Sequence, residues 1–201
     1  MNIDLTGMTV LVTGGSSGIG EEIVRCLAGS GAQVALHYHR GAEHAREIAR
    51  NAGDGVRCFE ADLSDPRQAR ELFGKVLTAF GRIHVLVNNA GIFVSSPIES
   101  DIENWLAGWE QTLAVNLTAA GVLSHAAVNH FREHEGGRII HIASRAAFRG
   151  ETEEYLAYAA SKGGMISLSR SIARSFGRDN ITSFVIAPGY VRTRMTEDYL
   201  D

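Results

Sequence analysis

The chain has 201 residues, long enough to bury roughly 70% of the surface that it would expose when unfolded. It carries 19 Lys and Arg against 23 Asp and Glu, a formal charge of -4, so it lacks the basic surface that nucleic-acid binding requires. Its two cysteines, Cys26 and Cys58, fit neither a disulfide framework nor a metal site, and no stretch reaches the ~18 apolar residues of a membrane span. We therefore expect a single-domain cytoplasmic protein with no nucleic-acid or membrane partner.

Six short runs rich in β-branched residues alternate with amphipathic stretches of helical length. Because the runs are apolar on both faces, the strands that they form need helices on both sides. The sequence therefore predicts an α/β domain with a doubly wound parallel sheet. The predicted strands are residues 8–13, 32–38, 55–61, 83–88, 138–143 and 181–187, and the helical stretches begin near Ile19, Ala42, Pro66, Asn104 and Tyr158.

The first strand leads into a glycine-rich turn, and a helix follows directly. Gly14, Gly18 and Gly20 let the chain turn sharply without a Cβ clash and let a ligand approach the main chain. The first N–H groups of the helix and its dipole favour an anion, so the turn predicts a pyrophosphate site. On the glycines alone, the alternative is a tight turn that binds nothing.

The stretch "TGGSSGIG" resembles the short-chain dehydrogenases/reductases, and the resemblance continues along essentially the whole chain. "ADL" ends the third strand, "NNAG" the fourth and "PGYVRT" the sixth, while "VNL" lies in a helix and "YAASK" follows the fifth strand. The resemblance implies a Rossmann-type fold, a nicotinamide cofactor and a small carbonyl or alcohol substrate. Within the family, the chain is similar to 3-oxoacyl-carrier-protein reductases.

The resemblance also implies the cofactor contacts. Asp62, with the Leu63 amide, would bind the adenine amino group, and a helix cap is the alternative role for this carboxylate. Asn88 would brace the central strands, and Thr193 would hold the nicotinamide carboxamide. The predicted cofactor residues are Gly14, Ser16, Ser17, Gly18, Ile19, Gly20, His39, Arg40, Asp62, Leu63, Asn89, Ala90, Gly91, Tyr158, Lys162, Pro188, Gly189, Val191 and Thr193.

The second strand ends on His39 and Arg40, without the acid that selects NAD by binding the adenosine ribose 2′-hydroxyl. An arginine can bind a 2′-phosphate through charge-assisted hydrogen bonds, so we expect NADP(H) to be preferred over NAD(H). The alternative is a solvated Arg40 and a site that accepts both cofactors. Ser16 and Ser17 stand where many NADP-preferring relatives carry a basic residue.

Tyr158 and Lys162 lie four residues apart, so on a helix they project from one face. A phenol titrates near ~10 in water, and we expect the neighbouring cation to lower its pKa by favouring the phenolate. Tyr158 would then exchange a proton with the substrate oxygen as hydride moves to or from the nicotinamide. By resemblance, Ser144 holds the same oxygen, and Asn116 orders a water that links Lys162 to solvent.

Other side chains near the predicted site have simpler interpretations. Tyr155 is a second phenol, but no lysine follows it at the fourth position, and His130 and His134 lack the residue order of a zinc-binding helix, so no metal is expected. The acidic stretch 151–154 either lines the substrate mouth or forms a solvated turn. Candidates for steering an anionic substrate are Arg145, Arg149, Arg192 and Arg194.

Relatives in the family usually continue beyond "PGYVRT" with another helix and a seventh strand, whereas this sequence stops at Asp201. We expect residues 1–201 to form one dinucleotide-binding domain without that last helix and strand. Either the protein is naturally short or it continues past Asp201, and we favour the second because the sixth strand would otherwise be an exposed edge. The helices around 117–131 and 158–176 have long apolar faces, which predict a homo-oligomer, a dimer or a tetramer.

The sequence as a whole predicts an NADP-dependent oxidoreductase that acts on a ketone or secondary alcohol, with a 3-oxoacyl thioester as one candidate substrate. The alternative is a nucleotide-binding sensor or scaffold without catalysis, but such a protein would be expected to have lost Ser144, Tyr158 or Lys162. Nucleotide-sugar epimerases share the Tyr-x3-Lys pair but usually have another glycine spacing and a larger C-terminal domain.

Overall fold

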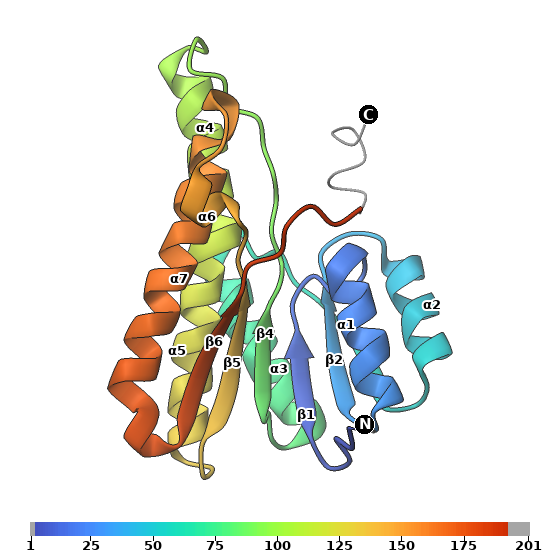
Figure 1. Cartoon of the computed structure of the whole chain (residues 1–201). Coiled ribbons are helices and arrows are strands. Elements are labelled where there is room, and N and C mark those ends of the chain that lie inside the picture. Colours follow the sequence, from blue (N-terminus) through green and yellow to red (C-terminus); the bar gives the residue numbers. More distant parts are fainter. Residues whose placement is uncertain (1–2, 193–201) are drawn as a thin grey trace.

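The computed structural model describes residues 3–192 and contains a six-stranded sheet with every strand parallel to its neighbours (Figure 1). Across the sheet the order is β3-β2-β1-β4-β5-β6, so the chain starts in the middle, winds to one edge and then to the other. This confirms the doubly wound sheet. The strands are β1 (Thr9–Val12), β2 (Gln33–Tyr38), β3 (Val56–Glu60), β4 (Val85–Asn88), β5 (Gly137–Ile142) and β6 (Ile181–Ile186).

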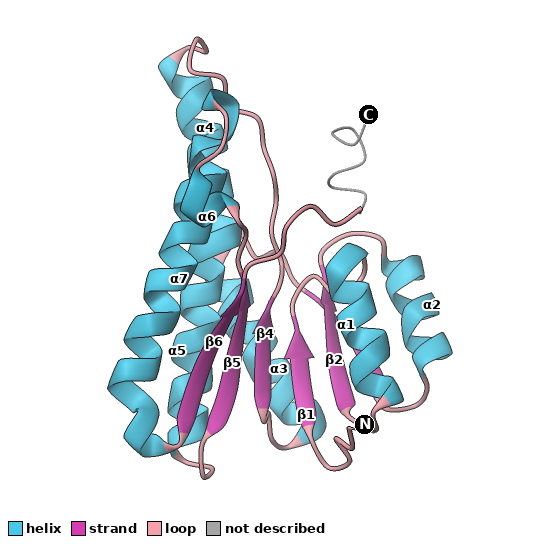
Figure 2. Ribbon diagram, viewed as in Figure 1, coloured by secondary structure: helices cyan, strands magenta, loops and turns pink. Residues whose placement is uncertain are grey.

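Helices cover both faces of the sheet (Figure 2). One face packs against α1 (Gly18–Gly29) and α2 (Ala42–Ala52), and the other against α3 (Pro66–Phe80), α5 (Ala119–Arg132) and α7 (Leu156–Phe176). The short helix α6 (Ala146–Arg149) lies between β5 and α7, and α4 (Ile102–Leu113) continues into α5 through a π-helical turn (Ala114–Thr118).

Two helices begin two residues earlier than the sequence predicts. Helix α4 begins at Ile102 because the Asp101 carboxylate caps it and accepts a hydrogen bond from the Asn104 N–H at 2.8 Å. Helix α7 begins at Leu156 because a 3₁₀ turn, Glu153–Tyr155, leads directly into it. These shifts leave the predicted order of strands and helices unchanged.

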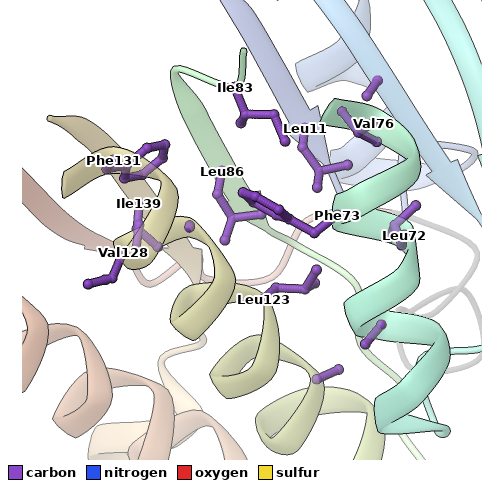
Figure 3. Close-up of a cluster of buried hydrophobic side chains, with 14 of the residues drawn as sticks. Leu11, Leu72, Phe73, Val76, Ile83, Leu86, Leu123, Val128, Phe131 and Ile139 are labelled. Atoms are coloured by element: carbon purple, nitrogen blue, oxygen red, sulfur yellow. The ribbon is translucent and has the colours of Figure 1, made fainter. Parts of the chain in front are cut away.

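The core forms one layer on each side of the sheet. The layer in Figure 3 packs Leu11 of β1 and Leu86 of β4 against Phe73 of α3 and Leu123 of α5, all buried. Full burial of such a side chain stabilises the fold by roughly 1.5–3 kcal/mol. The strands are thus packed on both faces, and the loops at their carboxyl ends extend from this packed core.

Strand β6 forms one edge of the sheet, and Phe184 and Ile186 are each 52% exposed on it. They lie on the face that α1 and α2 cover elsewhere in the sheet. Within residues 3–192, none of the helices has the length and apolarity needed to cross a bilayer.

Candidate active site

The glycine-rich turn lies between the end of β1 and the start of α1. Gly14 has φ +64°, and a Cβ on Gly20 would lie only 2.1 Å from the Gly14 carbonyl oxygen. The Asn89 amide donates hydrogen bonds to the carbonyl oxygens of Thr13 (2.8 Å) and Gly14 (3.1 Å), which ties the turn to the loop after β4. Ser17 makes no side-chain cap, so the first N–H groups of α1 remain available for an anion. The turn therefore fits a pyrophosphate.

The end of β2 has the exposed basic side chains that the sequence predicts. His39 and Arg40 are exposed at the start of the loop to α2, and within the described chain Arg40 forms no ion pair. The His39 imidazole lies 3.8 Å from the Asp62 carboxylate, which follows β3. Arg40 is therefore free to meet a phosphate, and its role there stays a prediction.

Asp62 forms a turn of its own after β3. Its carboxylate accepts hydrogen bonds from the Ser64 hydroxyl (2.7 Å) and the Ser64 N–H (2.9 Å), and these bonds lower its pKa. The cap of α3 is Asp65, whose carboxylate accepts from the Arg67 N–H, so the alternative that Asp62 caps a helix is wrong. The carboxylate of Asp62 remains partly exposed beside His39, and its contact with adenine stays a prediction.

Ser144 and Tyr158 come together above the carboxyl end of β5. Ser144 follows this strand, its hydroxyl accepts a hydrogen bond from the Ala146 N–H at 3.1 Å, and it is hydrogen-bonded to the Tyr158 phenol. Burial raises the pKa of Tyr158, the bond with Ser144 lowers it, and the negative charge of Glu151 raises it. In the protein alone, the pKa of Tyr158 therefore lies above its ordinary value, contrary to the predicted lowering, because burial outweighs the opposing effects.

Lys162 lies one turn after Tyr158 on α7 and is 4% exposed. Its ammonium donates a hydrogen bond to the Ile142 carbonyl at 2.8 Å and lies 5.7 Å from the centre of the Tyr158 ring. Burial lowers the pKa of Lys162 to about 8. The predicted pairing on one helix face is confirmed, with an ammonium held beside the phenol by the main chain.

Asn116 lies on the π-helical turn between α4 and α5, where the sequence predicts an ordinary helix. Its amide oxygen accepts from the Ile92 N–H at 2.8 Å, and its amide nitrogen donates to the Ile92 carbonyl (3.0 Å) and the Ser161 hydroxyl (3.2 Å). A Cβ on Gly91 would lie 3.4 Å from both the Asn116 oxygen and the Lys162 nitrogen. The turn thus brings Asn116 toward Lys162, and π-turns of this kind are frequent at functional sites.

A cavity of about 490 Å³ opens beside Ser144 and Tyr158. The Phe93 ring stacks on Tyr155 at a centroid distance of 3.7 Å and meets Tyr158 edge-on at 4.7 Å. The acidic stretch lines the cavity mouth, as one of its two interpretations predicts. The lining residues are Phe93, Ser144, Arg145, Glu151, Thr152, Glu154, Tyr155, Tyr158, Gly189 and Tyr190.

The predicted arginine cluster is only partly at the cavity. Arg145 lines it with its guanidinium 4.2 Å from the centre of the Tyr190 ring, while Arg149 forms a 2.6 Å ion pair with Glu151. Arg192 is exposed, and Arg194 lies outside the described residues. The carboxylates of Glu151 and Glu154 therefore offset the positive charge at the cavity.

The remaining predicted cofactor residues lie at the same carboxyl ends of the strands. Gly189 lines the cavity, and the Pro188 carbonyl accepts from the Arg145 N–H at 3.2 Å. Thr193 lies outside the described residues. No group of three or more His, Cys, Asp and Glu side chains within residues 3–192 is arranged to hold a metal. The other predicted cofactor residues also follow strand ends. After β1 come Ser16, Ser17, Gly18 and Ile19, after β3 comes Leu63, after β4 come Ala90 and Gly91, and after β6 comes Val191.

Two residues of this region were not predicted from the sequence. The buried His37 ring contacts the glycine-rich turn, and Phe93 forms one wall of the cavity. Phe93 follows the "NNAG" motif by two positions, which is the one sequence signal that could have identified it. Nothing in the spacing of His37 could have shown its partners.

The comparisons with known proteins agree with this geometry. Residues 8–201 match the short chain dehydrogenase family. The chain is 37% identical to nodulation protein G of Rhizobium sp. (strain N33), across 98% of this chain and 79% of that protein. It is 31% identical to a 3-oxoacyl-[acyl-carrier-protein] reductase of Synechocystis sp., across 96% and 78% of the two chains.

One solved structure adds a bound dinucleotide to the comparison. A short chain dehydrogenase from Burkholderia cenocepacia in complex with NADP superposes with a TM-score of 0.87 at 37% identity, across 95% of this chain and 77% of that one. Sequence similarity thus extends along nearly the whole chain. It accompanies the fold, the glycine-rich turn and the arrangement of Ser144, Tyr158 and Lys162. This chain belongs to the short-chain dehydrogenase/reductase family.

Proposed function

We propose that this enzyme uses NADP(H) to interconvert a ketone and a secondary alcohol, and that a 3-oxoacyl thioester is its first candidate substrate. The observation that carries the proposal is the hydrogen bond between Ser144 and Tyr158 at the wall of the cavity, with the Lys162 ammonium 5.7 Å from the Tyr158 ring. The similarity to the Synechocystis reductase supports the choice of substrate class.

Tyr158 is the proton donor in the reducing direction. A bound nicotinamide supplies the hydride, and the phenol gives its proton to the substrate oxygen as negative charge develops there. Because the pKa of Tyr158 is raised by burial, the phenol is protonated at neutral pH, as a donor must be. Ser144 holds the same oxygen from the other side and leaves room for the substrate in the cavity.

Lys162 and Asn116 support this proton transfer. The Lys162 ammonium is fixed by the Ile142 carbonyl, so its charge favours the phenolate that forms when Tyr158 has given up its proton. With a pKa of about 8, Lys162 can also exchange protons near neutral pH. Asn116, held by the Ile92 main chain, would order the water that connects Lys162 to solvent.

The preference for NADP(H) is supported by Arg40. Its guanidinium is exposed at the end of β2 and has no ion-pair partner among residues 3–192, whereas the acid typical of NAD-binding sites is missing from this position. The dissociation constants of NADP+ and NAD+, measured by calorimetry on the wild type and Arg40→Asp, test the preference. We expect tighter NADP+ binding that is lost in the variant, and a ratio near one in the wild type would contradict it.

Turnover tests the reaction itself. NADPH consumption should be followed with a panel of ketones that includes an acetoacetyl thioester, with Tyr158→Phe as the matched control. We expect turnover that falls by at least about 10²-fold in the variant while the dinucleotide still binds. Tight NADPH binding without turnover on any ketone would instead support the sensor or scaffold.

We also propose a homo-oligomer, but with the subunit contact around α4 instead of along the helices around 117–131 and 158–176. Helix α5 exposes no large apolar side chain, and α7 exposes Leu156 at its first turn, whereas α4 exposes Ile102 and Leu106. The exposed apolar side chains on these described helices thus lie around α4 rather than along α5. Sedimentation at micromolar concentration tests this proposal, and a monomer would contradict it.

A further inference from the structure

We propose that His37 is a positioning residue for the cofactor, because its neutral ring holds the glycine-rich turn and the adenine-side loop in one fixed arrangement. His37 belongs to β2 and is 2% exposed, so it cannot itself touch a dinucleotide over any large area. The inference rests on the nicotinamide cofactor binding at this turn, and it assigns a role to a residue outside the motifs of the family.

The ring of His37 joins two segments that the sequence keeps far apart. Its Nδ1 accepts a hydrogen bond from the Gly14 N–H at 3.0 Å, and its Nε2 lies 3.1 Å from the Ala61 carbonyl oxygen. The His37 carbonyl also accepts from the Gly15 N–H at 2.8 Å. Gly14 begins the predicted pyrophosphate site, and Ala61 directly precedes Asp62, so one side chain sets the distance between them.

These bonds fix the tautomer of the ring. The Gly14 main-chain nitrogen is a donor, so Nδ1 must carry a lone pair, and the single proton lies on Nε2 and is donated to Ala61. A second proton would point at the Gly14 N–H and leave that partly buried donor without its acceptor. Burial lowers the pKa of His37 to about 4, so the neutral form that these bonds require is the one present at neutral pH.

The groups around His37 are compatible with a neutral ring. The imidazole of His39, just after the end of β2, lowers the pKa of His37 further, and it lies 3.8 Å from the carboxylate of Asp62 in the loop after β3. The loop after β4 contributes the uncharged Asn89 amide at the same turn. On α3, Gln68 accepts from the Asp62 N–H, and the first acidic residue of α1, Glu21, is paired with Arg25 and His44. No carboxylate of the described chain is hydrogen-bonded to His37.

Two substitutions separate the role of Nδ1 from simple filling of space. In His37→Asn the amide oxygen lies near the position of Nδ1 and can still accept from the Gly14 N–H. In His37→Gln the amide reaches the position of Nε2 and keeps only the contact with Ala61. Both remove the ring, so each controls for the lost volume in the other.

The experiment measures the dissociation constant of NADP+ by calorimetry at pH 7.5 for the wild type and both variants. We expect His37→Asn, which loses only the contact with Ala61, to bind up to about threefold more weakly than the wild type. We expect His37→Gln to bind about tenfold or more weakly, because the Gly14 N–H of the turn itself has lost its acceptor. Equal losses in the two variants, or no loss in His37→Gln, would overturn the proposal. Melting temperatures and circular dichroism of the variants show that folded proteins are compared.

A second readout does not depend on the variants. Nitrogen-15 chemical shifts of the His37 ring in the wild type should show the Nε2-protonated tautomer and no titration near pH 6.5. The opposite tautomer, or a titration near 6.5, would overturn the proposal even if neither variant folds. If the wild type binds neither NADP+ nor NAD+, the cofactor assignment of the turn fails first, and this role fails with it.

Discussion

His141 should make the stability of this protein depend on pH. It lies in β5, is fully buried, and its Nδ1 is 3.4 Å from the Asn88 amide nitrogen, while its Nε2 has no hydrogen-bond partner among residues 3–192. Burial, with a smaller contribution from the charge of Lys162, lowers its pKa from 6.5 to about 4. The folded protein therefore keeps His141 neutral at pH values where the unfolded chain protonates it.

The sign and size of the effect follow from this difference. Between pH 6.5 and about 4 the unfolded state binds the additional proton, so the free energy of unfolding falls as the pH falls through this window and levels off below it. Each pKa unit corresponds to about 1.4 kcal/mol, which gives a loss of about 3 kcal/mol over the whole window. His37 has a similar shift and adds a loss of similar size.

Urea unfolding followed by circular dichroism at pH 7.0 and 4.5 measures this loss. We expect the stability of His141→Asn to fall by about 2 to 3 kcal/mol less than that of the wild type between the two pH values. The control is His125→Asn, because His125 is exposed on α5 and its replacement should leave the pH dependence unchanged. An equal loss of stability in the wild type and His141→Asn would refute the argument.

Two further predictions test the turn and the phenol. In Gly20→Ala the new Cβ would lie 2.1 Å from the Gly14 carbonyl oxygen, so we expect the free energy of unfolding in urea to fall by about 1–3 kcal/mol and dinucleotide binding to weaken. The control is Gly29→Ala in the same helix, whose Cβ meets nothing within 4 Å and should change neither quantity. Glu151→Gln removes a negative charge that raises the pKa of Tyr158, so the pH profile of kcat/KM should move to lower pH, and an unchanged profile would contradict the assignment.

The fold could be predicted from the sequence because its signals are local. Each strand is a short apolar run and each helix carries its own cap or periodicity, as with Asp65 and Pro66 at the start of α3. The parallel order also follows, since strands buried on both faces need connecting helices on both sides. The Tyr158 and Lys162 pair was predictable for the same reason, because four residues of helix determine their separation.

What the sequence could not show depends on contacts between distant segments. The Asn116 side chain, on the π-helical turn, is held by hydrogen bonds to the main chain of Ile92, which precedes it by 24 residues, and no local pattern encodes these contacts. His37 finds its partners in two other loops. The pKa of Tyr158 was predicted in the wrong direction because its burial depends on how the loops close around it, and burial has the largest effect.

The charges at the cavity show why counting along the sequence misleads. Four arginines near the strand ends suggest steering of an anion, but folding pairs Arg149 with Glu151 and lays Arg145 against the Tyr190 ring, with Glu154 also at the mouth. A cavity whose positive and negative charges nearly balance attracts an anion only weakly over distance. The stacked rings of Phe93 and Tyr155 instead offer an apolar wall beside the Tyr158 phenol. A thioester substrate would therefore be recognised through its neutral carbonyl and acyl chain, and its binding should depend little on salt concentration.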